Sequence, residues 1–592
     1  MQPTAKNSFT NVIEKLPESD IYRVYICGPT VYNSSHLGHA RTYITFDVIR
    51  RILEQVFQKT VVYQMNITDI DDKIITRSNE QGISSEQLAR KYEADFFADM
   101  DNLNIMRPTV VTRVTECMPA IIHFVQTIID NGYGYMSNGS VYFDTQAFSA
   151  KGFQYPQLRY ITQESQLEQL IAGDGISMKN RVDEKKSPND FALWKGAKPG
   201  EPFWESPFGQ GRPGWHIECS VMSNNVLVNE FNGFELHLGG KDLQFPHHAN
   251  EVAQLEAFYN KSDQIEVFMH SGHLRIDNEV MSKSKMNFKT IADVLQNYTA
   301  NQLRILFLQV DYASDINYST NQLDYAVALD AKITQFINNI STIEKQVSPP
   351  ELLPADMKLI KSMVNTKQAV KKAYAANFDY STGFMAILSL LEETKQYMQT
   401  AFKPYVVHQL KNFIQAQLEV LGLVFSKNSE ENSSLEVVKL LSEFRTTVKQ
   451  IATGELTKVA LLKACDDVRD NGLPPFGFQI EDKAGESVVK TINYQEFLKN
   501  QQRELLLKQE KEEKVRLQNL EKQKKLEEEM RLAQIPASEM FKSMPEYTEF
   551  DANGIPTKMK EGEEIVEVPK SKTKKLQKDQ ELRKKLNEKY AK

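Results

Sequence analysis

The sequence predicts an α/β protein: a Rossmann-like parallel-sheet domain with an inserted subdomain, then an α-helical bundle and a charged C-terminal extension. The apolar, aromatic run at 21–27 stops at a Gly-Pro pair and predicts a first strand. Apolar residues at helical spacing over 40–57 and a β-branched run at 60–64 then predict a helix and a second strand. Over 318–469 glycine is rare and apolar residues recur at helical spacing, which indicates the bundle.

The composition is that of an ordinary globular protein. With 592 residues, 41% of them apolar and 25% charged, the chain is not fibrous, collagen-like or disordered, and its length suggests about four domains. No apolar run approaches the ~18 residues that a membrane span needs. Residues 1–20 lack the features of a secretory signal or a transit peptide. Because four cysteines are too few for a disulfide framework, we expect a reducing, cytoplasmic location.

Changes in sequence character along the chain predict its domain boundaries. We expect a catalytic domain at 1–331, with an insertion at about 107–210 and a mobile loop at 280–288, then a helical domain at 332–472 and a Lys/Glu-rich helical extension at 473–592. Smaller expected elements are a helix at 113–131, a strand at 141–143, loops at 195–214 and a strand at 267–276.

The extension contains two charged segments. Residues 501–531 are nearly all Glu, Lys, Gln, Arg and Leu, which favours a long solvated helix over a coiled coil for self-association, because the apolar seam is thin. Residues 570–592 hold ten Lys or Arg against three acids in a chain of net charge −7. This basic end could follow a nucleic-acid backbone, although a solubilising tail is an equally good interpretation.

The segment His36-Leu37-Gly38-His39 lies where the first strand passes into the following helix. The N–H groups at a helix N-terminus favour anions, and Gly38 permits close approach of a ligand to the backbone. His36 and His39 could donate hydrogen bonds to phosphate oxygens. On these residues alone, two surface histidines at a helix cap are an equally good interpretation.

Downstream, Met281-Ser282-Lys283-Ser284-Lys285 lies in a polar segment after the strand expected at 267–276. Small hydroxyl residues around a lysine suit a loop that closes over phosphates and stabilises a leaving pyrophosphate. Taken alone, a solvated loop is the simpler interpretation. Together with the upstream histidine segment, the loop indicates a phosphate-binding site, while the dinucleotide and Walker A patterns are both missing from the sequence.

Cys27, Cys219, His247 and Glu251 form a candidate metal site. His247 and Glu251 are spaced i, i+4 and would share one face of a helix. Two thiolates, one imidazole and one carboxylate suit a four-coordinate Zn²⁺. A buried apolar role for each cysteine remains the alternative, since sequence spacing alone does not bring the three segments together.

Five blocks of sequence, taken in order, resemble the cysteinyl-tRNA synthetases, which are class I aminoacyl-tRNA synthetases. The blocks are Cys27–Tyr32 leading into His36–Arg41, then Asn66–Lys73, Gly211–Cys219, Phe245–Glu251 and Met281–Ser284. The resemblance runs from about Tyr22 to about Leu473, and the order and length of the blocks make it specific. The Lys/Glu-rich extension with its basic end resembles that of the eukaryotic cytosolic members.

The resemblance implies an ATP-dependent ligase, which forms cysteinyl-adenylate from L-cysteine and transfers cysteine to the 3′-terminal adenosine of tRNA(Cys). It implies one Zn²⁺ on Cys27, Cys219, His247 and Glu251, and Mg²⁺ arriving with ATP. The substrate's sulfur would join the Zn²⁺. A thiolate binds zinc far better than a hydroxyl does, so cysteine would be separated from serine without an editing domain.

The resemblance also implies roles for individual residues. His36 and His39 would contact the ATP phosphates, and Lys283 would hold the departing pyrophosphate. The implied ATP-binding residues are His36, Gly38, His39, Ser282, Lys283 and Ser284, and the implied amino-acid-binding residues are Thr68, Trp215, His237 and Asp242. Val280 stands where the family's loop usually begins with lysine, and Lys285 is a candidate replacement for that charge.

The region from about 332 to 469 is expected to carry the anticodon end of the tRNA. Three other interpretations stay open at this point. The chain could be a tRNA-binding paralogue without catalysis, a ligase that joins cysteine to a small amine, or a zinc hydrolase. The intact histidine and lysine motifs oppose the first, the long helical region opposes the second, and the lack of a motif such as HExxH opposes the third.

Overall fold

The protein is described here by a computed structural model. The residues described are 1–158, 182–228, 233–262, 264–276, 279–280, 289–343, 351–399, 402–425, 458–483, 486–562 and 564–590, with isolated positions between 440 and 451. They form two compact units, Met1–Lys499 and Asn500–Lys592. No helix in these described ranges is long and apolar enough to cross a bilayer.

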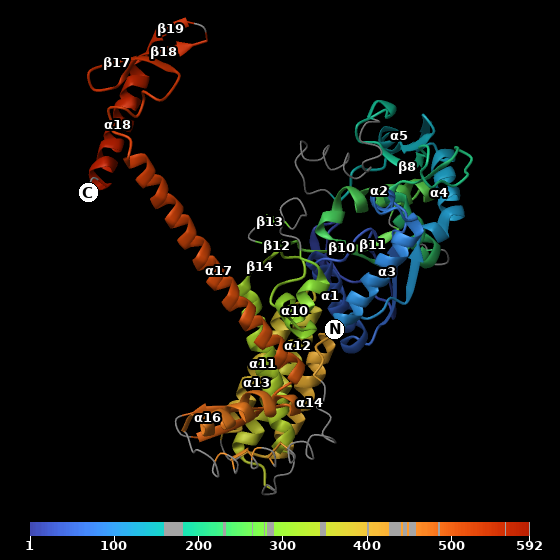
Figure 1. Cartoon of the computed structure of the whole chain (residues 1–592). Helices are drawn as coiled ribbons and strands as arrows, with labels where there is room; N and C mark the ends of the chain where they lie inside the picture. The colour runs from blue at the N-terminus through green and yellow to red at the C-terminus, as the bar shows by residue number, and fades with distance from the viewer. Residues whose placement is uncertain are drawn as a thin grey trace. The chain divides into compact units, whose positions relative to one another are not determined.

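A five-stranded parallel sheet forms the centre of the first unit (Figure 1). Its strands, in spatial order, are β11 (Ile265–Ser271), β10 (Phe234–Gly240), β3 (Ile21–Ile26), β4 (Thr60–Ile67) and β5 (Val110–Arg113). Helix α1 (Leu37–Arg51) joins β3 to β4, which confirms the expected opening βαβ unit. The chain progresses from β3 toward β5 on one side and toward β11 on the other. The strand order therefore reverses between β3 and β10, where parallel sheets bind ligands at the carboxyl ends of their strands.

An antiparallel sheet is inserted between β5 and β10. It contains β6 (Gly134–Ser137), β7 (Ser140–Phe143), β8 (Phe191–Gly196) and β9 (Gly211–Pro213), in that spatial order. The expected helix at 113–131 is shorter than predicted: α4 spans Met118–Asp130, because Arg113 belongs to β5 and a 3₁₀ turn intervenes. Helix α7 (Trp215–Ser223) comes one residue after β9 and packs beside β4, where the Gln64 side chain donates to the carbonyl of Met222 at 2.8 Å.

The strand expected at 267–276 is two strands. β11 ends at Ser271, and β12 (Leu274–Ile276) pairs instead with β14 (Ile316–Tyr318) and β13 (Glu279–Val280). The break falls at Gly272, whose backbone is so close to the carbonyl of Ser314 that an added Cβ would lie 2.1 Å from that oxygen. A bulkier residue there would separate the two segments.

The helical region that the sequence predicted after residue 318 is present, and it gathers at one end of the first unit (Figure 1). Its helices are α11 (Thr320–Ile343), α12 (Pro354–Ala375), α13 (Tyr380–Tyr397), α14 (Pro404–Val420) and α16 (Lys458–Asp467). One continuous apolar core joins the sheet, α1 and the helices α11 to α14. The fold class predicted from the sequence is therefore confirmed.

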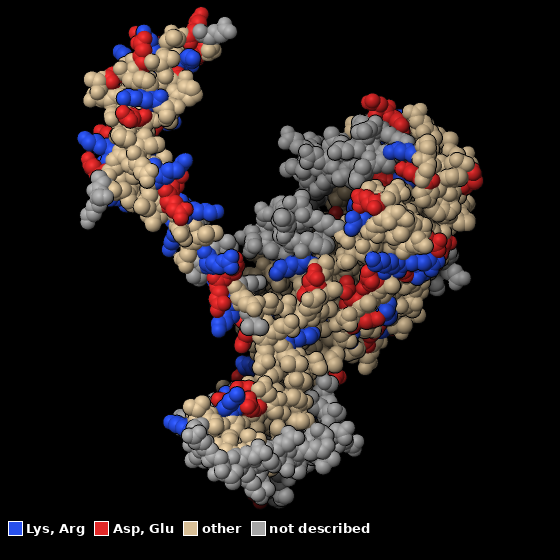
Figure 2. All heavy atoms as spheres, viewed as in Figure 1, with Lys and Arg blue, Asp and Glu red and all other residues tan. Residues whose placement is uncertain are grey.

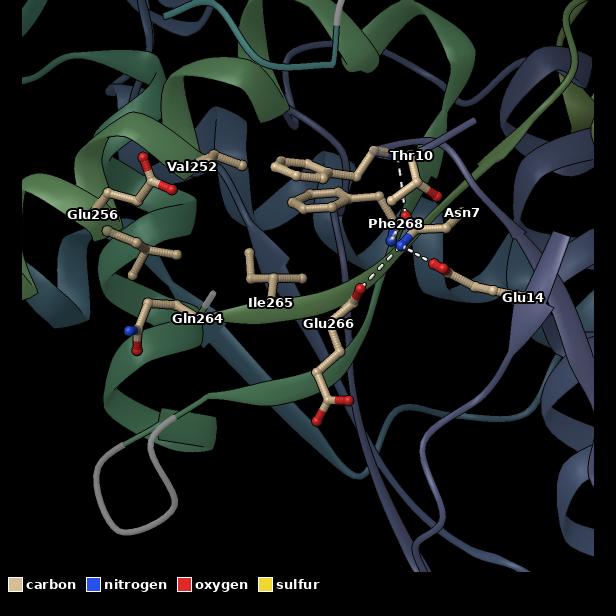
Figure 3. A pocket seen from close by; sticks show the side chains of 11 residues that line it. Asn7, Thr10, Glu14, Val252, Glu256, Gln264, Ile265, Glu266 and Phe268 are labelled. Atoms are coloured by element: carbon tan, nitrogen blue, oxygen red, sulfur yellow. Dashed lines mark hydrogen bonds between the residues drawn. The ribbon is translucent and has the colours of Figure 1, made fainter. Parts of the chain in front are cut away.

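An N-terminal hairpin covers the edge of the sheet at β11. Its strands are β1 (Thr4–Asn7) and β2 (Val12–Lys15). The Asn7 side chain donates to the carbonyl of Glu266 at 3.0 Å and accepts from the N–H of Phe268 at 3.0 Å (Figure 3). Phe9 stacks on Phe268 beside a small cavity of about 240 Å³. Covering an edge strand in this way limits its pairing with other chains.

The second unit has its own small core. The helix α17 (Tyr494–Ala533) includes the predicted segment 501–531, and on the face that Figure 2 shows, acidic and basic side chains are mixed along it. Three strands that the sequence analysis did not predict follow it: β17 (Tyr547–Phe550), β18 (Pro556–Glu561) and β19 (Glu564–Glu567). The helix α18 (Lys570–Tyr590) comes after them, within the region where a helical extension was expected. Their core contains Phe541, Tyr547, Ile555 and Leu576.

Candidate metal centre and adjoining pocket

Four buried side chains converge at the carboxyl ends of β3 and β10. They are Cys27, Cys219, His247 and Glu251, whose ligand atoms all lie within 4.8 Å of one another. The Cys27 Sγ is 3.8 Å from the Cys219 Sγ and 3.8 Å from the Glu251 Oε1, and the His247 Nε2 is 3.0 Å from the same oxygen. The fold thus brings together the three segments that sequence spacing could not connect.

Local structure explains how each of these side chains reaches the cluster. Cys27 directly follows β3 at the point where the strand order reverses, and Cys219 lies in α7. His247 lies in the wide turn 244–248 that leads into α8 (Ala249–Tyr259), and Glu251 lies in the first turn of that helix. The i, i+4 relation predicted for His247 and Glu251 therefore holds across the turn and the helix.

A second set of ligand atoms overlaps the first. His237 and His248, together with Cys27 and Glu251, also have ligand atoms within 4.8 Å of one another. The His248 Nε2 is 3.3 Å from the Cys27 Sγ, and the His237 Nε2 is 2.8 Å from the Glu251 Oε2. Sequence reasoning assigned no role to His248 and placed His237 with the amino-acid pocket. The position of His248 next to His247 in the sequence was the signal that could have identified it as a candidate ligand.

Burial and mutual charge determine how these groups ionise. Burial raises the pKa of the Cys27 thiol. Burial also tends to raise the pKa of Cys219, but the hydrogen bond from Cys27 and the charge of His247 outweigh it, so that the pKa of Cys219 is lowered. Burial tends to lower the pKa of His247, yet the negative Cys219 and Glu251 raise it. Cys219 and Glu251 are therefore the negative groups of the cluster, and a bound cation would take the place of the protons on Cys27 and His247.

The surrounding histidines are neutral. Burial lowers the pKa of His248 and of His216 well below the usual value, and it lowers the pKa of His270 to about 3. The His248 Nδ1 lies 2.7 Å from the His270 Nε2, and the His216 Nδ1 lies 3.0 Å from the His247 Nδ1. Hydrogen bonds of this kind fix the orientation and tautomer of imidazoles that bind a metal. Neutral imidazole and thiolate are the protonation states that metal binding requires.

A cavity of about 380 Å³ adjoins the cluster and shares Cys27 with it. Two predicted amino-acid-binding residues, Trp215 and Asp242, line this cavity. The Trp215 ring stacks on His247 at a centroid distance of 4.3 Å. Thr68 and His237 are buried but are not among the lining residues, and Thr68 donates to the Glu218 carboxylate at 3.1 Å.

The predicted histidine segment lies on another wall of the same cavity. The N–H of His39 donates to the His36 Nδ1 at 3.3 Å, so that His36 caps α1, and the two rings stack at 3.8 Å. Burial, with a smaller contribution from His36, holds the pKa of His39 well below its usual value. An added Cβ at Gly38 would lie 2.8 Å from the His36 ring, so a larger residue there would displace this ring.

The third predicted motif is not described by the structure. Ser282, Lys283, Ser284 and Lys285 lie outside the described residues, so their predicted roles stay predictions. The strands β12 and β13, which precede this segment in the sequence, are described. Leu274, which begins β12, lines the cavity, and Val280 ends β13 next to it.

Known proteins resemble this chain over most of its length. The family model described as tRNA synthetases class I (C) catalytic domain matches residues 13–328. The cytoplasmic cysteine–tRNA ligase of Dictyostelium discoideum is 40% identical and covers 96% of this chain and 88% of that protein. The corresponding cytoplasmic protein of Homo sapiens is 33% identical, with coverage of 99% and 94%.

A solved structure shares the fold. Mycobacterium tuberculosis methionyl-tRNA synthetase bound by methionyl-adenylate aligns with a TM-score of 0.50 at 16% identity, covering 71% of this chain and 94% of that one. The match to the family model spans more than half of the sequence, and the named relatives cover nearly all of it. The chain therefore belongs to the class I cysteine–tRNA ligase family, and the eukaryotic cytoplasmic members are among its relatives.

Proposed function

We propose that this chain is an active, cytoplasmic cysteine–tRNA ligase, which activates L-cysteine with ATP and transfers it to the 3′-terminal adenosine of tRNA(Cys). The observation that carries the proposal is the position of Cys27. This residue belongs both to the buried Cys/His/Glu cluster and to the lining of the cavity that contains the His36–His39 turn. An amino acid bound at the cluster would lie beside the wall on which we place ATP.

The donor set fits zinc. Cys27, Cys219, His247 and Glu251 would hold the ion, because two thiolates, an imidazole and a carboxylate match its preferences and their ligand atoms all lie within 4.8 Å of one another. When bound, Zn²⁺ supplies a soft Lewis acid that favours a thiolate over a hydroxyl. The protein's own contribution is the burial of the site and the hydrogen bonds that orient the ligands, such as that between His237 and Glu251.

The adjoining cavity would bind ATP and the rest of cysteine. We assign His36, Gly38 and His39 to the ATP phosphates, and Trp215 and Asp242 to the amino acid. Further residues assigned from the family resemblance are Thr68 and His237 for the amino acid and Ser282, Lys283 and Ser284 for ATP, with Lys283 holding the departing pyrophosphate. These groups would act by positioning the reactants and stabilising the developing charge. Mg²⁺ would accompany ATP.

The remaining parts of the chain would serve the tRNA. We assign 1–331 to catalysis, 332–472 to the anticodon end and 473–592 to an accessory extension. The helices α11 to α14 share an apolar core with the catalytic sheet, which supports a fixed distance between the anticodon end and the cavity. Self-association through the extension is a separate proposal, which sedimentation of the full chain would test.

Charging of total tRNA with radiolabelled cysteine tests the activity. We expect cysteine–tRNA to form with ATP and to decline after a zinc chelator, with recovery on added Zn²⁺. Radiolabelled serine is the matched control and is expected to give no product. Failure to charge tRNA would overturn the proposal. Transfer of cysteine to an added amine instead would favour the small-molecule ligase.

A further inference from the structure

Lys241 is a charged residue of the cavity to which the motifs assign no role. It directly follows β10, and it lines the cavity together with His36, His39 and Asp242. Its side chain is 47% exposed, and its Nζ lies 3.1 Å from the Asp315 Oδ1. The ammonium group is therefore solvated, charged and next to the space that we assign to ATP.

The described lining of the cavity offers few full positive charges for a polyanion. Its basic side chains, apart from histidines, are Lys73 and Lys241. The pKa of His39 is held low by burial, so this ring can contribute hydrogen bonds but no charge at neutral pH. Lys73 belongs to α2 (Asp72–Gln81), and its ammonium lies 5.6 Å from the centre of the Tyr32 ring. Lys241 is thus the cation that lies on the β10 side of the cavity.

Asp315 has other hydrogen-bond partners besides Lys241, so the lysine can leave without leaving this carboxylate unpaired. The Oδ1 of Asp315 also accepts from the N–H of His273 at 3.1 Å, and its Oδ2 accepts from Arg275 at 3.1 Å and 3.3 Å. If Lys241 turned toward an anion, Asp315 would keep Arg275 as a partner. Because half-exposed ion pairs are weak, a phosphate with several negative charges would compete well for the lysine.

We propose that Lys241 is a phosphate-binding residue for ATP, which exchanges its contact with Asp315 for the ATP phosphates, while Asp315 stays anchored by Arg275. The inference rests on the proposed function, since it needs ATP in this cavity.

Lys241→Met in the full-length chain tests this role by cysteine-dependent ATP–pyrophosphate exchange. We expect the KM for ATP to rise about tenfold, as is usual for the loss of one charge-assisted contact to phosphate. The KM for cysteine should stay unchanged, and Lys241→Arg should remain close to the unsubstituted protein. Lys59→Met is the matched control, because it removes another partly exposed lysine paired with an aspartate, Asp20, at 3.1 Å.

Two readouts separate binding from folding and from the proposed function. Calorimetric titration with ATP alone should show the same loss of affinity in Lys241→Met, at an unchanged thermal midpoint. Equal ATP affinity and equal KM for ATP in Lys241→Met and Lys59→Met would overturn the inference. If the unsubstituted protein showed no cysteine-dependent exchange, the proposed function would fail, whereas the titration with ATP would still decide the role of Lys241.

Discussion

At the scale of single residues, the two overlapping ligand sets differ in their chemistry. Both contain Cys27 and Glu251, but one adds a second thiol and the other adds two imidazoles. Since two thiolates hold Zn²⁺ more strongly, we predict that His247→Ala lowers the zinc content of the purified protein and that His248→Ala does not. Metal analysis per chain measures the difference. Equal zinc loss in both variants would contradict the assignment.

Asp99 gives a second prediction at this scale. It is 8% exposed in α3 (Ser85–Asn102), and burial with a smaller contribution from Asp95 raises its pKa to about 6. The unfolded value is near 3.9, so the folded state is penalised as pH rises through the interval between the two values. We predict that Asp99→Asn stabilises the protein by ~1 kcal/mol at pH 7.5 and gains little at pH 4.

Urea unfolding at the two pH values measures this gain. Asp95→Asn is the matched control, because it removes the repulsion while leaving Asp99 in place, and it should recover only part of the stabilisation. A gain for Asp99→Asn that does not depend on pH would show that packing, rather than ionisation, limits stability at this position.

Motif order predicted the four residues of one ligand set, but not the second set that overlaps it. Cys27, Cys219, His247 and Glu251 converge as the metal hypothesis required. His248 escaped notice although it is spaced i, i+3 from Glu251, and that spacing also brings two residues together on a helix. The ring nitrogens of His247 and His248 lie 3.0 Å and 4.0 Å from the Glu251 Oε1. The contact of His248 with Cys27, which follows a strand far away in the sequence, is a tertiary effect that periodicity does not reveal.

At the scale of elements, Arg41 connects α1 to other parts of the first unit through hydrogen bonds. This residue is fully buried, and its guanidinium donates to the carbonyls of Phe307 at 3.3 Å, Asp311 at 2.9 Å and Tyr312 at 3.3 Å. It also donates to the hydroxyl of Tyr380 in α13 at 3.3 Å. A single side chain thus connects the helix of the His36–His39 turn to the helical region.

We predict that Arg41→Met lowers the free energy of unfolding by ~3 kcal/mol, because several buried acceptors lose their donor at once. Chemical denaturation followed by circular dichroism measures the loss. Arg90→Met is the control, since Arg90 is exposed and pairs with Glu86 within one helix at 3.0 Å, where a change within ~0.5 kcal/mol is expected. Similar losses for both arginines would refute the role given to Arg41.

The accuracy of the predicted elements followed the strength of their apolar patterns. The strands at 21–27 and 60–64 and the helix after His36 were predictable, because long buried elements carry clear periodicity. The strands β17 to β19 were missed, since they are short and charged residues interrupt their apolar pattern. Their stability comes from the core around Phe541 and Tyr547, a tertiary effect that no local pattern reveals.

At the scale of the whole molecule, the chain must bind a polyanion although its own net charge is −7. The charge is uneven, because residues 570–592 hold ten Lys or Arg against three acids. The structure forms most of this segment into α18, on which Lys574, Lys578 and Lys585 are exposed. Spacings of four and seven residues place these three lysines on one side of the helix, as contact with a phosphate backbone requires.

We predict that Lys574→Glu, Lys578→Glu and Lys585→Glu together raise the KM for tRNA and reduce the salt dependence of tRNA binding, since each phosphate contact releases counterions. ATP–pyrophosphate exchange without tRNA should stay unchanged. The matched control reverses three exposed lysines of α17, Lys508, Lys511 and Lys514, with the same change in net charge. Because acidic neighbours already neutralise those lysines, their reversal should alter the salt dependence less. If both triple variants behaved alike, the effect would come from net charge, and α18 would be a solubilising surface rather than a tRNA contact.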